Sequence, residues 1–574
     1  MKKLAGLCII ILCLGFKNQH LNKDVSFAHF KNRFILAYWK QNPMIATSAG
    51  FHNYDSLLPA YSENFRKQYR IFCHTYLDSL HKFDSEKLDA SDQLDKTIMY
   101  NALTSQLFYQ DTFKAWQWDP SVYNIGSALA EILQAHNLKP TEKHTCLMKR
   151  IWLIREYYEQ AMDNIVNPTL EHIKIAIEQN EGTIAYLKGD FYSEMSRLEQ
   201  VSYTAGFDLN LYIEVNAVEA IQNYILFLKD VQSKQKNKGK NFRIGKALYD
   251  RKFELDIQSN ESAKEIYLKA LKRKDEMHTK MTAITTQLWP KYFKEAQPKD
   301  SLKAIRQLIQ KISLKHVSRD LFLQRITAQI SQLSNFVKEK NLIYLDPDKP
   351  LMVRKTPAYM DGVAGASISA PGPYDKEAET FYNVSTLEKM SSGEAESYLR
   401  EYNFYALQIL NIHEAIPGHY VQLIYANQSP SLIKTLFSNG AMVEGWAVYS
   451  ERMMLENGYG NNEPEMQLMY CKWHLRSVCN TILDYSVHVL NWDQEKANLL
   501  LTKEAFQQQT EANGKWRRVS LTQVQLCSYF SGYTEIYELR ERLKQKGDFD
   551  QKAFHEKFLS FGSAPVKEIA KIME

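Results

Sequence analysis

Cysteine is scarce in this chain, and its spacing matches neither a disulfide framework nor a C-x-x-C motif. Two of the seven cysteines, Cys8 and Cys13, fall within the first 16 residues. The remaining five are Cys73, Cys146, Cys471, Cys479 and Cys527. Their number is odd and their spacing irregular, which does not indicate paired disulfides. We therefore expect these five residues to be mostly buried thiols.

A strong net charge is also missing. The 71 Lys and Arg residues nearly balance the 66 Asp and Glu residues, which leaves a formal net charge of +5. This value is small for 574 residues, so the composition does not indicate a nucleic-acid partner. No apolar run after residue 16 approaches the roughly 20 residues that a membrane-spanning helix needs. We expect no nucleic-acid binding, and no membrane span once the N-terminal segment is removed.

The N-terminus has the pattern of a secretory signal. Two lysines precede an apolar run, Leu4–Phe16, which is followed by polar residues. We predict a signal peptide over residues 1–22 and an extracytoplasmic protein, either periplasmic or secreted. No A-x-A cleavage site follows, so two alternatives stay open. One is an uncleaved membrane anchor. The other is lipid attachment at Cys13, although Leu12 precedes it where lipoprotein signals usually have a small residue.

Most of the remaining chain is predicted to be helical, because apolar residues recur at intervals of three and four. The segments with this spacing are Phe27–Lys40, Glu63–Leu80, Gln93–Tyr109, Lys143–Ile165, Thr169–Lys188, Ser193–Gln232, Ser262–Thr286, Lys303–Asn335 and Gly393–His413. Proline and glycine concentrate between residues 342 and 384, where Ala366–Ala370 and Thr380–Val384 predict a small sheet. We expect a mainly α fold, with an N-terminal helical region over 23–341 and a second region of the same domain over 342–574.

Two short motifs in the second region point to a metal site. H-E-A-I-P-G-H begins at residue 413, and E-G-W-A-V-Y-S-E begins at residue 444. Two histidines and one glutamate are a common ligand set for a catalytic Zn²⁺ that keeps one position open for water. We therefore predict His413, His419 and Glu444 as the ligands of one zinc ion, with Glu414 as the base that activates the water. Other divalent ions also occupy such sites.

The spacing of the two histidines requires a break in the helix. On a regular helix, six residues separate two side chains by about 120° and about 9 Å along the axis, too far for one metal. Pro417 and Gly418 lie between His413 and His419. Proline removes a backbone donor and disfavours helix before it, and glycine adopts conformations closed to other residues. We therefore predict a Pro-Gly bulge that returns His419 to the metal-facing side.

Two further pairs have both a functional and a structural interpretation. Glu444 and Glu451 are two helical turns apart and share a face, so Glu451 is either a residue that orients a ligand or an ordinary surface carboxylate. Asp484 and His488 have i,i+4 spacing. An imidazole steered by a carboxylate suits a transition-state hydrogen-bond donor, and the alternative is a purely structural pair.

Near the C-terminus, Arg518, Gln525 and Tyr529 are candidates for contacts with the substrate. A tyrosine hydroxyl can stabilise the oxyanion that develops at an attacked carbonyl, and an arginine can hold a carboxylate bidentately. Chemistry alone does not single these residues out, since the chain has 34 tyrosines and Arg517 lies beside Arg518.

Together these motifs resemble the bacterial DUF885 family, which is similar to gluzincin-type metallopeptidases. The resemblance runs from about residue 24 to the end. It also includes W-D-P-S-V-Y (Trp118–Tyr123), P-G-P-Y-D and T-F-Y-N-V (within Pro371–Val384), and F-H-E-K-F-L-S-F-G-S-A-P (Phe554–Pro565). It implies a large two-lobed helical fold with a deep channel, and the same zinc ligands and base as above.

The resemblance also implies roles for residues around the channel. Tyr529 and His488 would lie in the cleft, as would Arg518. We predict Arg518, Tyr382, Asn383 and Gln525 as substrate-binding residues. In zinc peptidases a strand beside the metal helix pairs with the substrate backbone, so we expect one of the two β-leaning pieces to form an edge of the cleft.

The chain departs from the family pattern at two places. Asn480 and Ser486 stand where the family has an arginine and a glycine, and Gln523-Val524 replace a Pro-Gly pair. The loss of a cation leaves the preferred peptide terminus open. The metal motif itself has no such departure, which argues against an inactive enzyme.

These observations predict a zinc-dependent peptidase that acts on short peptides, as a carboxypeptidase, dipeptidase or oligopeptidase. Glu414 would move the proton, and Tyr529 or His488 would stabilise the oxyanion. Two alternatives remain: a zinc-containing peptide-binding protein without turnover, and a metal-dependent hydrolase of a non-peptide amide or ester. The sequence does not indicate the natural substrate or the oligomeric state.

Overall fold

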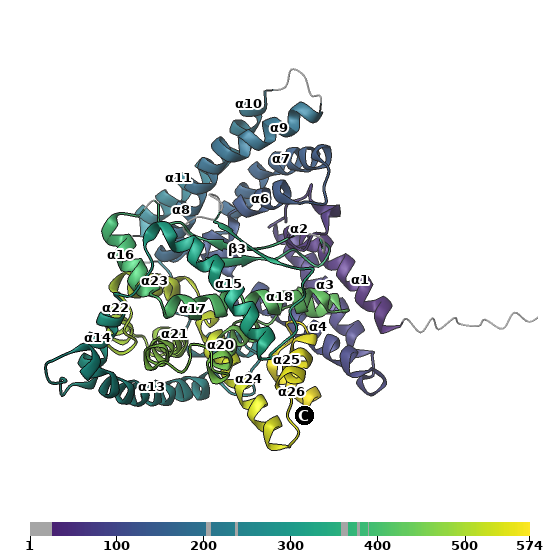
Figure 1. The fold of residues 1–574 in the computed structure, drawn as a ribbon. Coiled ribbons are helices and arrows are strands. Elements are labelled where there is room, and N and C mark those ends of the chain that lie inside the picture. Colours follow the sequence, from purple (N-terminus) through teal and green to yellow (C-terminus); the bar gives the residue numbers. More distant parts are fainter. Residues whose placement is uncertain (1–25, 203–207, 236–238, 357–365, 376–378, 389) are drawn as a thin grey trace, which may run out of the picture.

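The structure is a computed structural model that describes residues 26–202, 208–235, 239–356, 366–375, 379–388 and 390–574. It is mainly helical, as predicted, with one small sheet (Figure 1). The predicted signal peptide over 1–22 lies outside the described residues. Within them, no helix is both long enough and apolar enough to span a membrane. The five described cysteines are free thiols, and four of them are buried, as expected.

The first half of the chain is a succession of helices. Its first group is α1 (Phe27–Gln41), α2 (Pro43–Ser48), α3 (Glu63–His81) and α4 (Ala90–Phe108). A second group is α5 (Ala115–Trp118), α6 (Gly126–Gln134), α7 (Pro140–Asn164), α8 (Leu170–Tyr186), α9 (Tyr192–Ser202), α10 (Leu209–Ile213) and α11 (Glu219–Gln235). A third is α12 (Gly245–Asp256), α13 (Ala263–Tyr292), α14 (Ser301–Ile312) and α15 (Phe322–Glu339).

The second half carries the sheet and the remaining helices. The strands are β1 (Leu351–Lys355), β2 (Ala366–Ser369) and β3 (Thr380–Val384). The helices are α16 (Ser392–Glu401), α17 (Ala406–Glu414), α18 (His419–Gln428), α19 (Leu432–Leu436), α20 (Gly440–Glu456), α21 (Pro464–His488), α22 (Gln494–Leu499), α23 (Gln509–Leu521), α24 (Ser528–Gln545), α25 (Gln551–Ser560) and α26 (Val566–Met573).

Short polar side chains set the starts of several helices. Ser62 accepts a hydrogen bond from the backbone N–H of Phe65 at the start of α3. Ser262 and Glu265 form a reciprocal capping box at the start of α13. Such caps satisfy backbone donors that have no partner within the first helical turn. The serine-to-glutamate spacing is local, so the sequence indicates these boundaries directly.

Two helices predicted as continuous are interrupted. The segment Lys303–Asn335 is split into α14 and α15 by a linker over 313–321, where the carbonyl of Lys315 accepts the backbone N–H of Phe404 at 2.8 Å. The segment Gly393–His413 is split into α16 and α17, where the Asn403 side chain accepts the N–H of Tyr405 at 3.1 Å. In both places a tertiary or side-chain hydrogen bond replaces the helical one, which apolar periodicity alone does not reveal.

The small sheet places an edge strand beside the metal helix. Its order is β1-β3-β2, with β1 parallel and β2 antiparallel to β3. Both predicted pieces form strands, and β1 is an addition that the sequence did not predict. The two predicted pieces are β2 and β3. Since β3 is the central strand, β2 is the one of the two that lies at an edge of the sheet, and it packs against α17.

Two large apolar clusters hold the molecule together. The smaller lies among α6 to α11 and contains residues between Tyr123 and Leu228. The larger combines residues from 27–103, 242–343 and 382–570, so the boundary predicted at 341/342 does not separate two packed units. Figure 1 shows α7, α9, α10 and α11 at the top and α13, α20, α21 and α24 below, with β3 between them. Two lobes that flank a deep channel stay a prediction.

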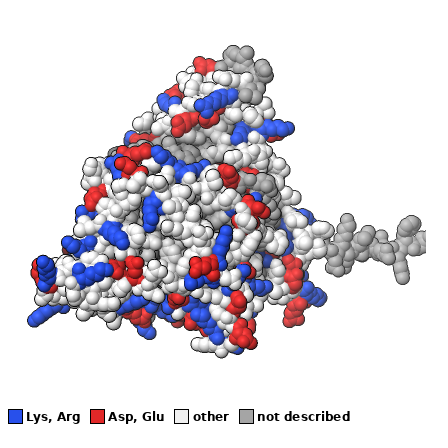
Figure 2. Space-filling model, in the orientation of Figure 1, with Lys and Arg blue, Asp and Glu red and all other residues white. Residues whose placement is uncertain are grey.

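On the face shown in Figure 2, basic and acidic side chains of the described residues are intermixed. This distribution follows from the near balance of 71 basic and 66 acidic residues in the sequence.

Candidate metal centre and catalytic site

The first motif is interrupted in the way that the spacing of its histidines requires. Helix α17 ends at Glu414 and α18 begins at His419, and the Ile416–Pro417 peptide bond between them is cis. The N–H of Gly418 donates to the carbonyl of Ile412 at 3.0 Å, which folds the loop back on α17. A Cβ atom on Gly418 would lie 1.8 Å from the carbonyl oxygen of His413, so only glycine fits here.

The second motif holds this loop in place. Trp446 is buried in α20 and donates its indole N–H to the carbonyl of Pro417 at 2.8 Å. The hydroxyl of Ser450, one turn further, donates to the carbonyl of Trp446 at 2.9 Å and approaches the same Pro417 oxygen at 3.5 Å. Helix α20 therefore holds the loop through Trp446 and Ser450, and the same helix carries Glu444 two residues before Trp446.

The three predicted ligands converge. One ligand atom from each of His413, His419 and Glu444 lies within 4.8 Å of the others. The carboxylate Oε2 of Glu444 is 3.8 Å from Nε2 of His413 and 3.5 Å from Nε2 of His419. Atoms that bind one zinc tetrahedrally at about 2.1 Å are about 3.4 Å apart. The donor types and their separations therefore fit a zinc ion.

Glu451 supports the first ligand. Nδ1 of His413 is 2.7 Å from Oε1 of Glu451, and that oxygen also accepts the indole N–H of Trp473 at 3.0 Å. Glu451 is fully buried, so its interpretation as a surface carboxylate is wrong. A carboxylate on Nδ1 fixes the tautomer of a histidine and leaves Nε2 unprotonated for a metal.

The charges at this site influence one another strongly. Burial lowers the pKa of His413, but Glu451, Glu414 and Glu444 outweigh it and raise this pKa to about 9. Burial raises the pKa of Glu414 against the opposing effect of the two histidines. Burial also acts to raise the pKa of Glu444, yet His419 and the neighbouring cations lower it overall. The carboxylate of Glu444 is thus stabilised for ligation, and that of Glu414 has a raised affinity for a proton.

Arg518, Gln525 and Tyr529 lie together at the same site. The guanidinium of Arg518 donates to Oε1 of Gln525 at 2.8 Å and to the hydroxyl of Tyr529 at 3.1 Å. The ring of Tyr529 stacks on that of His413 with centroids 6.4 Å apart. Burial and the charge of Glu444 raise the pKa of Tyr529 to about 12. The hydroxyl therefore stays protonated and can act as a hydrogen-bond donor.

His488 does not reach the site, in contrast to the prediction. Its ring is fully buried, and Nε2 donates to the carbonyls of Val519 and Thr522 at 2.9 and 3.0 Å. Burial lowers the pKa of His488 to about 4, so the ring is neutral. Asp484, one turn earlier, accepts the backbone N–H of Val524 at 3.0 Å. The pair is structural: it anchors the segment that precedes Gln525 and Tyr529.

The turn before Gln525 has a glycine-like backbone at a residue that is not glycine. Val524 has a φ of +70°, a region that β-branched residues rarely adopt, and its side chain is fully buried. Its N–H and that of Leu526 are both bonded to the carboxylate of Asp484 at 3.0 Å. These two hydrogen bonds and the burial of Val524 hold the turn without the Pro-Gly pair.

Tyr382 and Asn383 have structural roles rather than the predicted contact with substrate. Both are fully buried on β3, the central strand. The hydroxyl of Tyr382 donates to the Asn411 side chain at 2.8 Å, which ties the sheet to α17. The Asn383 side chain accepts a hydrogen bond from the guanidinium of Arg354 on β1 at 2.7 Å. It also donates one to the hydroxyl of Ser369 on β2 at 2.7 Å. Neither side chain is free to bind a ligand.

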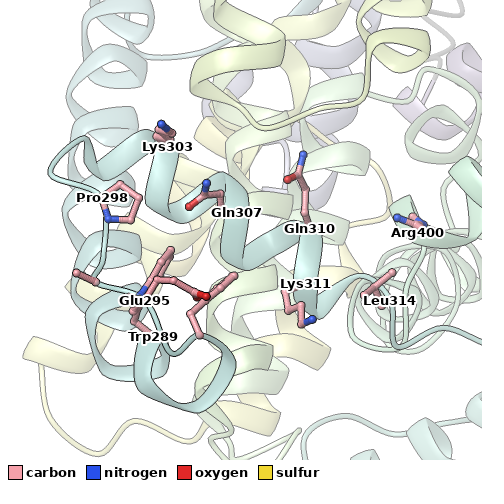
Figure 3. A pocket seen from close by; sticks show the side chains of 11 residues that line it. Trp289, Glu295, Pro298, Lys303, Gln307, Gln310, Lys311, Leu314 and Arg400 are labelled. Atoms are coloured by element: carbon pink, nitrogen blue, oxygen red, sulfur yellow. The ribbon is translucent and has the colours of Figure 1, made fainter.

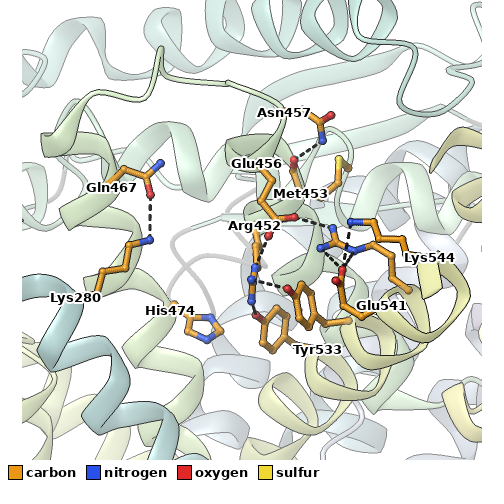
Figure 4. Close-up of polar contacts among 12 residues, drawn as sticks. Lys280, Arg452, Met453, Glu456, Asn457, Gln467, His474, Tyr533, Glu541 and Lys544 are labelled. Atoms are coloured by element: carbon orange, nitrogen blue, oxygen red, sulfur yellow. Dashed lines mark hydrogen bonds and ion pairs between the residues drawn. The ribbon is translucent and has the colours of Figure 1, made fainter. Parts of the chain in front are cut away.

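The helices α20 and α24 cross in close contact, which brings Glu444 to the side of Tyr529. A Cβ atom on Gly445 would lie 2.3 Å from the carbonyl carbon of Gly532, so the two backbones touch. Polar contacts continue this interface (Figure 4): Arg452 donates to the hydroxyl of Tyr533 at 2.6 Å. Gly445 directly follows Glu444, and Gly532 lies three residues after Tyr529 on the same helix, so their close approach sets the distance across the site.

Replacement of Gly532 by alanine should destabilise the protein. The added Cβ would lie 1.7 Å from the carbonyl oxygen of Ala441, so one helix backbone must move. We expect a loss of about 3 kcal/mol in the free energy of unfolding, measured by urea denaturation. Gly514→Ala is the control, since Gly514 is exposed in α23 with nothing within 4 Å, and there alanine should stabilise slightly. Equal stability of the two variants would contradict close packing at Gly532.

Sequence reasoning missed a buried cation near the ligands, Lys515 of α23. Its ammonium interacts electrostatically with Arg518 and Glu444, and the side chain is only 8% exposed. The available signal was its position three residues before Arg518, on the same helical face.

A surface pocket of about 530 Å³ lies elsewhere, at α13, α14 and their connection (Figure 3). Its lining includes Trp289, Pro298, Lys303, Gln310 and Arg400 and contains none of the predicted site residues. This pocket is therefore separate from the candidate metal site, which is identified by its converging histidine and glutamate side chains.

Comparisons with known proteins extend over almost the whole chain. The model of a family described as a bacterial protein of unknown function, DUF885, matches residues 43–573. A solved structure of a candidate lipoprotein of unknown function from Shewanella oneidensis is 48% identical, with a TM-score of 0.86, and the match covers 96% of this chain and 99% of that chain.

A second solved structure, of a candidate lipoprotein from Colwellia psychrerythraea, shares the fold. It is 17% identical, with a TM-score of 0.74, and the match covers 95% of this chain and 97% of that chain. No curated protein is significantly similar in sequence to this chain. The family model thus gives the family, the solved structures share the fold, and none of them names an activity.

Proposed function

For this chain, which belongs to the DUF885 family of bacterial proteins, we propose a zinc-dependent peptidase that hydrolyses short peptides. The observation that carries the proposal is the convergence of His413, His419 and Glu444. Next to them lies the carboxylate of Glu414, which is not one of the three ligands. A purely structural zinc site would not need this adjacent base. A catalytic site does, because the attacking water must lose a proton.

Each residue at the site has a distinct part in the proposed reaction. A Zn²⁺ ion held by the two histidines and Glu444 would polarise the peptide carbonyl and lower the pKa of a water molecule. Glu414 accepts a proton from the attacking water and delivers it to the departing amine nitrogen. Its raised pKa suits both steps. Glu451 holds the ring of His413 in place throughout.

Tyr529 is the proposed donor to the developing oxyanion. Arg518 donates to its hydroxyl oxygen, so the hydroxyl proton remains available for the substrate. A donor at this position stabilises the negative charge that forms on the carbonyl oxygen. The edge strand β2, beside α17, is the proposed pairing partner for the substrate backbone.

We also propose that the protein works outside the cytoplasm. The lysine pair and the apolar run Leu4–Phe16 have the pattern of an export signal. The relative from Shewanella oneidensis, 48% identical, is named as a candidate lipoprotein. Attachment to a membrane through the N-terminal segment, with Cys13 as the candidate for lipid modification, is therefore part of the proposal.

Metal content and its effect on turnover test the proposal. Elemental mass spectrometry should find about one zinc ion per chain, and little in His413→Ala or Glu444→Ala. The zinc-loaded protein should cleave members of a broad library of short peptides. A chelator should abolish this cleavage, and added zinc should restore it.

The results also separate the alternatives. Zinc-loaded protein that binds peptides without cleaving any would favour the peptide-binding protein. Cleavage of esters or non-peptide amides, without cleavage of peptides, would favour a metal-dependent hydrolase of such compounds. Absence of metal after zinc is supplied would contradict the site itself.

A further inference from the structure

A buried cluster of charges beside the metal ligands is not used by the proposed chemistry. Four cations of this cluster lie on α21 and α23, and two acids accompany them. Glu401 pairs with Lys472 at 2.7 Å and with Arg476 at 3.0 Å. The other acid, Glu511, pairs with Arg476 at 2.6 Å. Both acids are thus engaged by the two cations of α21.

The two cations that α23 contributes to the cluster, Lys515 and Arg518, have no carboxylate partner, whereas Arg517 of the same helix pairs with Glu178 outside it. Among the described residues, no carboxylate oxygen lies within 4 Å of the charged nitrogens of Lys515 or Arg518, and Lys515 makes no side-chain hydrogen bond. Arg518 bonds only to neutral oxygens, those of Gln525 and Tyr529. Of the two acids that act on Lys515, Glu511 already pairs with Arg476, and Glu444 is a predicted zinc ligand. In this cluster the four basic side chains therefore outnumber the two acidic ones.

This arrangement costs folding free energy. Lys515 is desolvated without a hydrogen-bonded partner, and the charges of Glu511 and Glu444 offset only part of that cost. Burial, together with the charges of Arg476 and Arg518, lowers the pKa of Lys515 to about 7. Proteins keep such groups mainly at functional sites, where a ligand completes the set of partners.

We propose that Lys515, together with Arg518, binds a carboxylate of the substrate, so that the enzyme prefers peptides with a free carboxyl terminus. The inference rests on the proposed function, because a peptidase substrate is what brings a carboxylate to this position. Lys515 is then the residue that determines specificity. A substrate with an acidic side chain offers the same chemistry from a second source, and the experiment below distinguishes the two.

Binding of matched peptides tests the proposal. Glu414→Gln prevents turnover, and in this background calorimetry compares Ala-Ala-Phe with its C-terminal amide. The free acid should bind at least about 30-fold more tightly, and Lys515→Met should remove most of that preference. Lys503→Met, at an exposed lysine of the same region, should leave it intact. Tight binding of Ala-Ala-Asp amide would assign the site to acidic side chains and overturn the preference for a free terminus.

Stability provides a second measurement, which does not depend on catalysis. The pKa of Lys515 is about 7 in the folded protein and 10.5 ordinarily, so between these values the unfolded chain binds more protons. The wild type should gain stability as pH rises from 7 towards 10.5. Lys515→Met removes the buried charge, so its Tm should exceed that of the wild type at pH 6, by a difference that shrinks towards pH 10.

The two tests separate this inference from the proposed function. Equal binding of acid and amide, binding of neither peptide, or a preference that survives Lys515→Met would overturn the carboxylate site. A lower Tm for Lys515→Met at pH 6 would make Lys515 a structural residue and would also overturn it. Zinc content and library cleavage report on the peptidase proposal independently of these results.

Discussion

Replacement of Glu414 by glutamine should lower kcat for peptide cleavage by about 10³-fold while the zinc content stays unchanged. Glutamine has the shape of glutamate but cannot accept the proton of the attacking water. Glu414 directly follows the ligand His413, and the ligand set does not include it. The measurement is steady-state cleavage of a peptide found in the library screen, together with zinc content by elemental mass spectrometry.

A matched control shows that the loss is specific to the base. Glu388 is exposed after β3, pairs with Lys355 at 2.8 Å and is not among the converging ligands. Glu388→Gln should therefore keep wild-type kcat. A Glu414→Gln variant that retains a tenth or more of the wild-type rate would mean that another group moves the proton.

Replacement of Gly418 by alanine should abolish zinc binding. The new methyl would lie 1.8 Å from the carbonyl oxygen of His413 and 2.4 Å from that of Ile412. The loop must therefore move away from α17, which breaks the hydrogen bond from Gly418 to Ile412 and carries His419 out of position. We expect zinc affinity to fall by about 100-fold or more, and peptide cleavage with it.

Two controls locate the effect in the loop. Gly393→Ala changes a helical glycine of α16 with nothing within 4 Å, and it should keep its zinc. Circular dichroism of Gly418→Ala should retain the helical signal, since the change is confined to a four-residue connection. Full zinc content in Gly418→Ala would show that the close approach at Gly418 is not needed to bring the histidines together.

The helical character was predictable because it depends on local spacing. Periodic apolar residues indicated most helices to within a few residues, as in α1 and α3. The interrupted helix between His413 and His419 was predictable for a similar reason. Proline and glycine restrict the backbone wherever they occur, and two histidines six residues apart cannot otherwise share a metal.

The roles of individual polar residues were less predictable. His488 and Tyr382 have the chemistry of site residues, yet both are fully buried and bonded to protein groups. The sequence allowed Glu451 to be either a surface carboxylate or a residue that orients a metal ligand. Its burial and its hydrogen bond from Trp473 show that it is not a surface residue. A side chain's chemistry says what it can do, and only its neighbours decide whether a substrate can reach it.

The sequence by itself thus determined a mainly α fold, three candidate ligands that converge in the structure, and the break in the helix at Pro417–Gly418. Tertiary structure alone decided which residues surround these ligands. The contact of Gly445 with Gly532 brings α20 and α24 together across residues distant in the chain. The unpaired state of Lys515 also depends on which acids other helices supply. Such long-range contacts leave no periodic signal, because each depends on the whole packing of the chain.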